Sequence, residues 1–196
     1  MNYNEASALP EKVILASGSP RRRELLGEMG IQFEIDVPDV DETVEGLPGE
    51  MVAILAERKA RAVAERRGEG LIIAADTLVA LNDEALGKPV DEADAWRMLR
   101  ALSGQMHAVY TGVCVMDAKT GRCLTDSVRT GIQLKTLTDE EIAAYIATGE
   151  PADKAGAYAI QGKGGAFVSG YDGSYTNVVG LPTERLTEML REINRE

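Results

Sequence analysis

The sequence predicts an α/β domain built on a mixed sheet, because strand-like and helix-like patterns alternate along the chain without an internal repeat. Residues 71–81, "LIIAADTLVAL", form a near-continuous apolar run, which is typical of a strand covered on both faces. Residues 48–67 carry apolar side chains at helical spacing. The length of 196 residues fits one domain, which we expect to have two lobes around a central cleft.

The first elements follow from cap and turn chemistry. Residues 1–11 are expected to be a loose tail, and the single domain is expected to span 12–196. "VILAS" predicts a short buried strand. Ser19 and Pro20 then supply the hydroxyl cap and the first-turn proline of a helix, and Gly30 ends it.

An acidic loop and a long helix come next. "IQFEID" alternates apolar and polar residues, and the loop after it holds three carboxylates: Asp39, Asp41 and Glu42. The helix from Pro48 to about Arg67 is expected to turn four apolar side chains inward: Met51, Val52, Leu55 and Val63. After the strand at 71–81, "LNDEAL" is a turn signal.

The second half continues the alternation. "DEADAWRMLRALSG" predicts a helix capped by Asp91, with a buried face formed by Trp96, Leu99 and Leu102. Residues 107–115 alternate along a strand, and "DAKTG" turns the chain into a partner strand that ends near Leu137. "TDEE" at 138–141 is a capping box that opens a further helix. The last helix carries an apolar stripe: Leu186, Met189, Leu190 and Ile193.

The composition limits the classes of partner. The net charge of −11 argues against general binding to nucleic acid or to an anionic membrane, because like charges repel. No apolar run approaches the ~18 residues of a membrane span, and "MNYNEASALPEK" lacks the features of a signal peptide. We therefore expect a cytoplasmic protein. Cys114 and Cys123 lie on either side of a turn and could be bridged, but two free thiols are the expected state in a reducing compartment.

Three consecutive arginines stand out against this acidic background. Arg21, Arg22 and Arg23 follow the Ser19 cap, where the helix dipole already makes positive charge unfavourable by a few tenths of a kcal/mol per cation. A solvated charged face is the ordinary interpretation of such a run. An anion bound at the helix start would reverse the sign of that cost, and guanidinium groups match phosphate oxygens. We favour an anion site.

Asp76 is the second unusual residue, because a carboxylate inside an apolar strand is costly unless it is paired or metal-bound. It is either a structural carboxylate bonded to nearby backbone or a functional group. Asp39, Asp41 and Glu42 could join it around a divalent cation, since Mg²⁺ takes one or two carboxylates together with water and phosphate. On spacing alone the 39–42 cluster is a solvated loop.

Weaker signals support the same chemistry. Lys88 lies in a rigid "GKP" turn, and residues 156–180 hold 7 of the 20 glycines. That segment is either a glycine-rich binding loop that includes Gln161 or a set of tight hairpin turns. His107 is the only histidine, which argues against a zinc site or a histidine-dependent triad. Together these features indicate a protein that handles a nucleotide polyphosphate with a metal ion.

Several linked motifs resemble the Maf family, once called septum-formation-inhibitor-like proteins. They run in order from "LASGSPRRRELL" through "DVDET", "AADTLVAL", "GKP" and "LSGQMHAVYTGV" to "TGEPADKAGAYAIQGKGGAFV" and "GSYTNVVGLP", and cover about residues 14–182. The resemblance implies an inosine-triphosphatase-like α/β fold. It also implies a nucleoside triphosphate pyrophosphatase, which releases a monophosphate and pyrophosphate with Mg²⁺ or Mn²⁺.

The resemblance also implies roles for individual residues. Asp76 would accept a proton from the attacking water, and Glu42 and Asp76 would bind the metal. The implied phosphate-binding residues are Ser17, Ser19, Arg21, Arg22, Lys59 and Lys88.

Within the family, the branch that is selective for dTTP and UTP is similar to this chain at three positions: Arg21, Thr77 and Gln161. A glutamine amide can pair with O4 and N3–H of thymine or uracil. The chain departs from the family at Arg58, before the motif lysine, and at Ala152, after "GEP".

The expected function is therefore house-cleaning hydrolysis of dTTP and UTP, or of modified pyrimidine nucleotides, by a homodimer. The alternative is a nucleotide-binding regulator of septation that binds the same ligand without turnover.

Overall fold

The computed structural model describes residues 12–193, so the tail predicted at 1–11 and the last three residues lie outside the described part. Contacts group these residues into two compact units. The first unit comprises residues 12–76, 111–128 and 180–193, and the second comprises 77–110 and 129–179. The described chain thus forms two compact parts.

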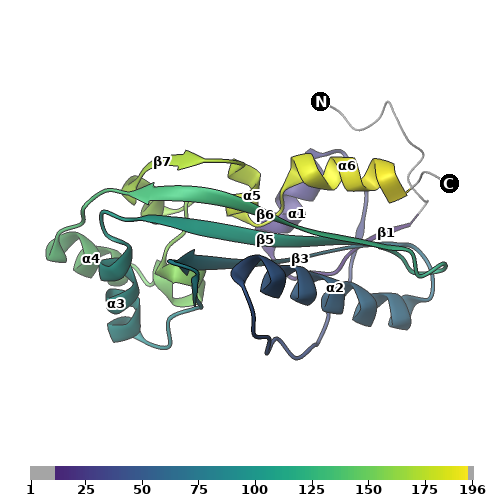
Figure 1. Cartoon of the computed structure of the whole chain (residues 1–196), viewed down its shortest axis with the longest axis horizontal. Coiled ribbons are helices and arrows are strands. Elements are labelled where there is room, and N and C mark those ends of the chain that lie inside the picture. Colours follow the sequence, from purple (N-terminus) through teal and green to yellow (C-terminus); the bar gives the residue numbers. More distant parts are fainter. Residues whose placement is uncertain (1–11, 194–196) are drawn as a thin grey trace. The chain divides into compact units, whose positions relative to one another are not determined.

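The elements alternate between strands and helices, as the sequence predicts (Figure 1). The strands are β1 (Val13–Leu15), β2 (Glu34–Ile35), β3 (Leu71–Leu81), β4 (Glu84–Leu86), β5 (Met106–Asp117), β6 (Cys123–Leu134) and β7 (Val168–Asp172). The helices are α1 (Pro20–Glu28), α2 (Pro48–Arg67), α3 (Glu92–Leu102), α4 (Asp139–Ile146), α5 (Tyr175–Val179) and α6 (Thr183–Ile193).

The strands form one mixed sheet in the order β2-β1-β3-β5-β6-β7, with β4 paired to β3. β1 runs parallel to both β2 and β3, with Ile14 opposite Glu34 on one side and Ile72 on the other. β4 and β7 run antiparallel to β3 and β6. The mixed α/β class predicted from the sequence is confirmed.

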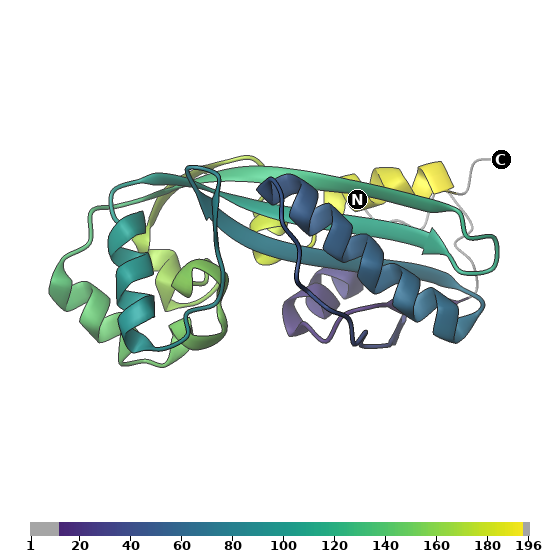
Figure 2. The ribbon, with the colours of Figure 1, turned by 60° about the horizontal axis from the view of Figure 1, so that its bottom comes forward.

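In the first unit, α2 and α6 lie on opposite faces of the sheet, as Figures 1 and 2 both show. The α2 face of the core alternates along β1 and β3 and includes Ile14, Ala16, Ile72 and Ala74, packed with Ala56 and Ala60 of the helix. Three of the four α2 residues predicted to point inward are buried: Val52, Leu55 and Val63. Met51 is only partly buried.

Gly112 explains how closely α2 approaches the sheet. A Cβ built at this position of β5 would lie 2.0 Å from the backbone oxygen of Val52 in α2. Real side chains do not tolerate such a contact, so only glycine allows the helix backbone to rest against the strand here. Gly112, in "VYTGVCV", therefore allows α2 to pack directly on the backbone of β5.

The second unit has its own apolar core, which includes Leu99, Leu102, Ile132 and Ile142. Its caps match the sequence signals, because Asp91 accepts a hydrogen bond from the Asp94 amide and Thr138 forms a capping box with Glu141. The "LNDEAL" turn is a two-residue hairpin between β3 and β4. Both of its turn residues have positive φ, 51° at Asn82 and 64° at Asp83.

The glycine-rich segment is not a set of hairpins. It folds as short 3₁₀ turns at Ala155–Ala157 and Lys163–Phe167, followed by β7 and α5. Asn177 anchors α5, because its side-chain amide donates to the Val109 backbone oxygen at 3.1 Å and to Thr130 Oγ at 2.9 Å. Between residues 12 and 193, no helix has the length and hydropathy needed to cross a membrane.

Candidate active site

The start of α1 is built as the sequence predicts. Ser19 is the N-cap and its hydroxyl accepts from the Arg22 amide at 3.4 Å, while Pro20 occupies the first turn. The Ser17 hydroxyl in turn accepts from the Ser19 amide at 3.2 Å. The first turn reads Pro-Arg-Arg-Arg, so it has no acidic side chain to complement the helix dipole.

The guanidinium group of Arg22 is held in place by two hydrogen bonds. Its Nε donates to the Gly180 backbone oxygen at 2.8 Å, and its Nη1 donates to Ser17 Oγ at 3.2 Å. Burial lowers the pKa of the Arg22 guanidinium, and the neighbouring Arg21 lowers it further, whereas Asp76 and Glu42 oppose this shift. A cation that is desolvated and placed beside another cation favours the approach of an anion.

Lys59 joins the two carboxylates that the sequence singled out. Its Nζ lies 2.6 Å from Asp76 Oδ1 and 2.7 Å from Glu42 Oε1. The side chains of Lys59 and Asp76 are only 11% and 14% exposed, whereas that of Glu42 is 64% exposed. Asp76 is the sixth residue of β3, so the ion pair with Lys59 explains how an apolar strand accommodates a carboxylate.

The acidic loop is tied to α2 at a second point. The guanidinium of Arg58 donates to the backbone oxygens of Asp41 and Thr43. The Asp41 side chain accepts from the Thr43 amide at 2.8 Å, and this hydrogen bond lowers its pKa. Arg58 thus holds the backbone on either side of Glu42.

The donor set at this point suits a hard divalent cation. Glu42 and Asp76 each offer carboxylate oxygens to one position, now bridged by the Lys59 ammonium. Among residues 12–193, no group of three or more His, Cys, Asp or Glu side chains could hold a metal. Two carboxylates nevertheless fit Mg²⁺, which usually completes its coordination with water and substrate phosphate.

Three predicted site residues belong to the second unit. Thr77 follows Asp76 in β3 and is partly buried, whereas Lys88 and Gln161 are exposed. Lys88 follows β4, and the Gly87 backbone oxygen beside it accepts from the Gly156 amide at 3.0 Å. Gln161 lies just before the Lys163–Phe167 turn.

Glu150, which no sequence pattern indicates as a site residue, holds the segment around Gln161. Its carboxylate accepts from the Tyr145 hydroxyl at 2.8 Å and from the amides of Lys163 and Gly164 at 3.0 and 3.1 Å. Burial alone would raise its pKa, but these hydrogen bonds outweigh burial and lower it.

The carboxylate also explains a glycine. A Cβ at Gly162 would lie 2.2 Å from Glu150 Oε1, so the loop closes around the carboxylate only with glycine there. In the sequence, "GEP" lies upstream of "QGKGG", but neither segment reveals that the two pair, because they meet only in the fold.

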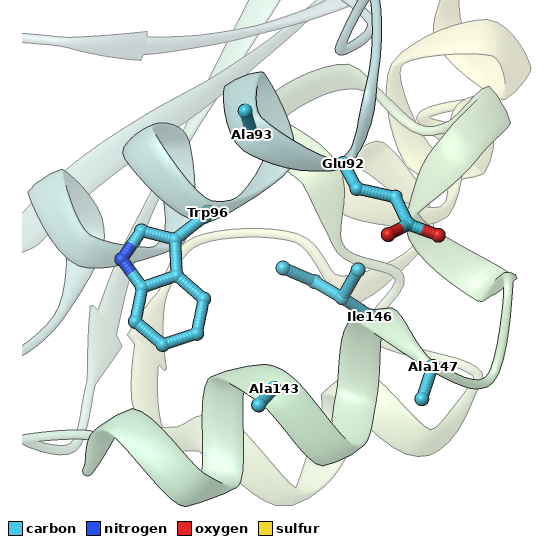
Figure 3. A pocket seen from close by; sticks show the side chains of 6 residues that line it. All are labelled: Glu92, Ala93, Trp96, Ala143, Ile146 and Ala147. Atoms are coloured by element: carbon cyan, nitrogen blue, oxygen red, sulfur yellow. The ribbon is translucent and has the colours of Figure 1, made fainter.

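A separate pocket of about 440 Å³ lies between α3 and α4, where Trp96 and Ile146 point toward one another (Figure 3). Its other lining residues are Glu92, Ala93, Ala143 and Ala147. This lining contains a carboxylate and no cation, and it includes none of the predicted site residues. It is therefore unsuited to a polyphosphate.

Known proteins resemble this chain over almost its whole length. The family model described as "Maf-like protein" matches residues 12–193. A dTTP/UTP pyrophosphatase of Pelotomaculum thermopropionicum is 51% identical over 184 residues, which cover 93% of this chain and 96% of that protein. A dTTP/UTP pyrophosphatase of Desulforamulus reducens is 49% identical over 181 residues, 91% of this chain and 95% of the relative. One of Bacillus cereus is 50% identical over 185 residues, 93% and 96% of the two chains.

Proposed function

Because the chain belongs to the Maf family, we propose that it is a nucleoside triphosphate pyrophosphatase that hydrolyses dTTP and UTP to the monophosphate and pyrophosphate. Its similarity to three proteins of that name over nine tenths of its length supports this proposal. In the cell the reaction would remove unwanted pyrimidine nucleotides, modified ones included. We also propose that the enzyme acts in the cytoplasm and that it is a homodimer.

The observation that carries the proposed chemistry is the pairing of Asp76 and Glu42 through Lys59. In the hydrolysis we propose, Asp76 accepts a proton from the attacking water. Lys59 holds the carboxylate in place and, with Lys88, offsets negative charge on the phosphates. Glu42 and Asp76 are the residues that would hold Mg²⁺ or Mn²⁺, and the bound ion would neutralise charge on the leaving pyrophosphate.

The phosphates are assigned to the start of α1. Ser17, Ser19 and the arginines Arg21 and Arg22 present hydroxyl and guanidinium donors there, together with the backbone amides of the first turn. Binding of the nucleobase is assigned to Thr77 and Gln161. The exposed Gln161 amide offers both a donor and an acceptor to the edge of uracil or thymine.

Product analysis tests the proposal directly. Purified protein is incubated with dTTP, UTP, CTP or 7-methyl-GTP and Mg²⁺, and the products are identified by chromatography. We expect dTTP and UTP to yield monophosphate and pyrophosphate fastest. Release of inorganic phosphate would indicate a phosphatase instead. Binding of dTTP without turnover, with either Mg²⁺ or Mn²⁺, would indicate the nucleotide-binding regulator.

A further inference from the structure

Two thiols meet across the β5–β6 hairpin, outside the residues assigned to catalysis. The Sγ atoms of Cys114 in β5 and Cys123 at the start of β6 are 3.3 Å apart. The hairpin is closed beside them by a hydrogen bond of 2.9 Å from the Asp117 amide to the Arg122 oxygen. Both thiols are free, and both strands are held by the sheet, so the sulfur atoms face one another in an ordered frame.

The two sulfur atoms differ in access. Cys114 is fully buried in the core beneath α2, together with Ala56 and Ala60. Cys123 is half-buried at the edge of that core, where solvent reaches it. An oxidant in solution can therefore reach Cys123 first, and the buried Cys114 is the partner thiol that reacts with it afterwards.

The surroundings favour a thiolate at Cys123. The hydrogen bond from the Cys114 thiol lowers the pKa of Cys123 to about 6, although burial opposes the shift, and it raises the pKa of Cys114. The charged groups facing the pair come from α2: Glu57 raises the pKa of Cys123 and Arg61 lowers it. Thr125 Oγ lies 3.5 Å from Cys123 Sγ and contacts Glu57. Thiolates are the reactive form in oxidation.

We propose that Cys114 and Cys123 are a site of reversible oxidation that forms an intramolecular disulfide in the presence of a hydroperoxide. The Cys123 thiolate attacks the peroxide O–O bond and becomes a sulfenic acid, and the peroxide is reduced to hydroxide or alkoxide. The Cys114 sulfur then attacks the Cys123 sulfur. Its proton leaves with the sulfenic hydroxyl as water, and the S–S bond forms. A reducing thiol reverses the change by disulfide exchange.

To form the bond, the two Sγ atoms must approach from 3.3 Å to the ~2.0 Å of an S–S bond. The new link would close a short loop through the turn at 118–122 and would leave Asp76, Lys59 and Arg22 untouched. The proposal is therefore independent of the assigned catalytic function.

Peptide mapping of the full chain tests the proposal. The reduced protein is treated with hydrogen peroxide, alkylated in denaturant, and digested with trypsin without reductant. Lys119 and Arg122 lie between the two cysteines, so trypsin separates them into different peptides. We expect one linked pair of peptides, lighter by two hydrogen atoms than the sum of the two reduced peptides, and loss of the link after treatment with dithiothreitol.

Two variants separate the formation of the sulfenic acid from the formation of the disulfide. In Cys114→Ser the partner thiol is absent but a hydroxyl remains to donate to the Cys123 thiolate, so Cys123 should stop at the sulfenic acid and be labelled by dimedone. Cys123→Ser should leave Cys114 reduced, because that sulfur is buried. Complete alkylation of both cysteines in the oxidised wild-type protein would overturn the proposal, whatever the variants do. Links found only between two chains would overturn it as well.

Discussion

Asp76 is the proposed general base, and its mostly buried carboxylate lies 2.6 Å from the Lys59 ammonium. Replacing Asp76 with asparagine keeps the shape and removes the charge. We expect turnover of dTTP to fall by roughly 10³-fold or more, since a general base contributes about 10²–10⁴. Pyrophosphate release measures the loss, and circular dichroism checks that the fold persists. Near-normal activity would rule out Asp76 as the base.

The role of Arg22 can be tested by a substitution that keeps its positive charge. Its guanidinium reaches Ser17 and the Gly180 oxygen at once, and a lysine ammonium cannot reproduce that fork. Arg22→Lys should lower kcat/KM for dTTP by roughly 10- to 100-fold, about 1.4–2.7 kcal/mol of transition-state binding. Arg23→Lys is the matched control, because Arg23 is the exposed next residue of the same helix. Equal effects in both variants would contradict the assigned role of Arg22.

At the scale of elements, α2 presents Lys59 and Arg58 from a helix whose backbone rests against β5. Gly112→Ala would place a Cβ 2.0 Å from the Val52 oxygen, so α2 must shift. We expect a loss of about 3 kcal/mol or more in the free energy of unfolding. Urea denaturation gives this value. The control is Gly27→Ala, where a Cβ meets nothing within 4 Å and should stabilise α1 by up to about 1 kcal/mol.

The loop around Gln161 depends on Glu150. Glu150→Ala leaves the Tyr145 hydroxyl and the amides of Lys163 and Gly164 without their acceptor. We expect faster hydrogen exchange at residues 162–164. Because Gln161 is proposed to bind the nucleobase, we also expect the KM for dTTP to rise by roughly tenfold, with kcat little changed. Lys163→Ala is the control, because it keeps the backbone amide that Glu150 binds. Unaltered exchange in Glu150→Ala would show that the carboxylate does not hold the loop.

The sequence predicts the local parts of these elements well. Helix α2 begins at Pro48 and ends at Arg67 as expected, and β3 spans 71–81, because cap chemistry and apolar runs act over a few neighbouring residues. Pairings between distant residues do not leave such a trace. The sequence flags Asp76 as anomalous, but it does not reveal that Lys59 is its partner rather than backbone. The Arg22–Gly180 and Glu150–Lys163 contacts are invisible for the same reason.

At the scale of the whole molecule, the single histidine links stability to pH. His107 is buried, its Nε2 lies 2.7 Å from the Tyr158 hydroxyl, and burial lowers its pKa from 6.5 to about 4. The neighbouring Tyr158 hydroxyl is neutral in acid, and burial raises its pKa further. The unfolded chain therefore binds a proton at His107 at a higher pH than the folded chain does. This contribution to stability is complete above about pH 6.5 and is lost as the pH falls toward 4.

Urea denaturation at pH 7 and pH 5 measures this dependence. With pKa values of 6.5 unfolded and about 4 folded, His107 should account for about 2 kcal/mol less stability at pH 5 than at pH 7. His107→Gln retains a polar partner for Tyr158 and cannot titrate, so its stability should fall less over the same range. Since carboxylates are common to both proteins, the difference between their slopes isolates the histidine. Identical slopes would mean that His107 is protonated as easily in the folded protein as in the unfolded chain.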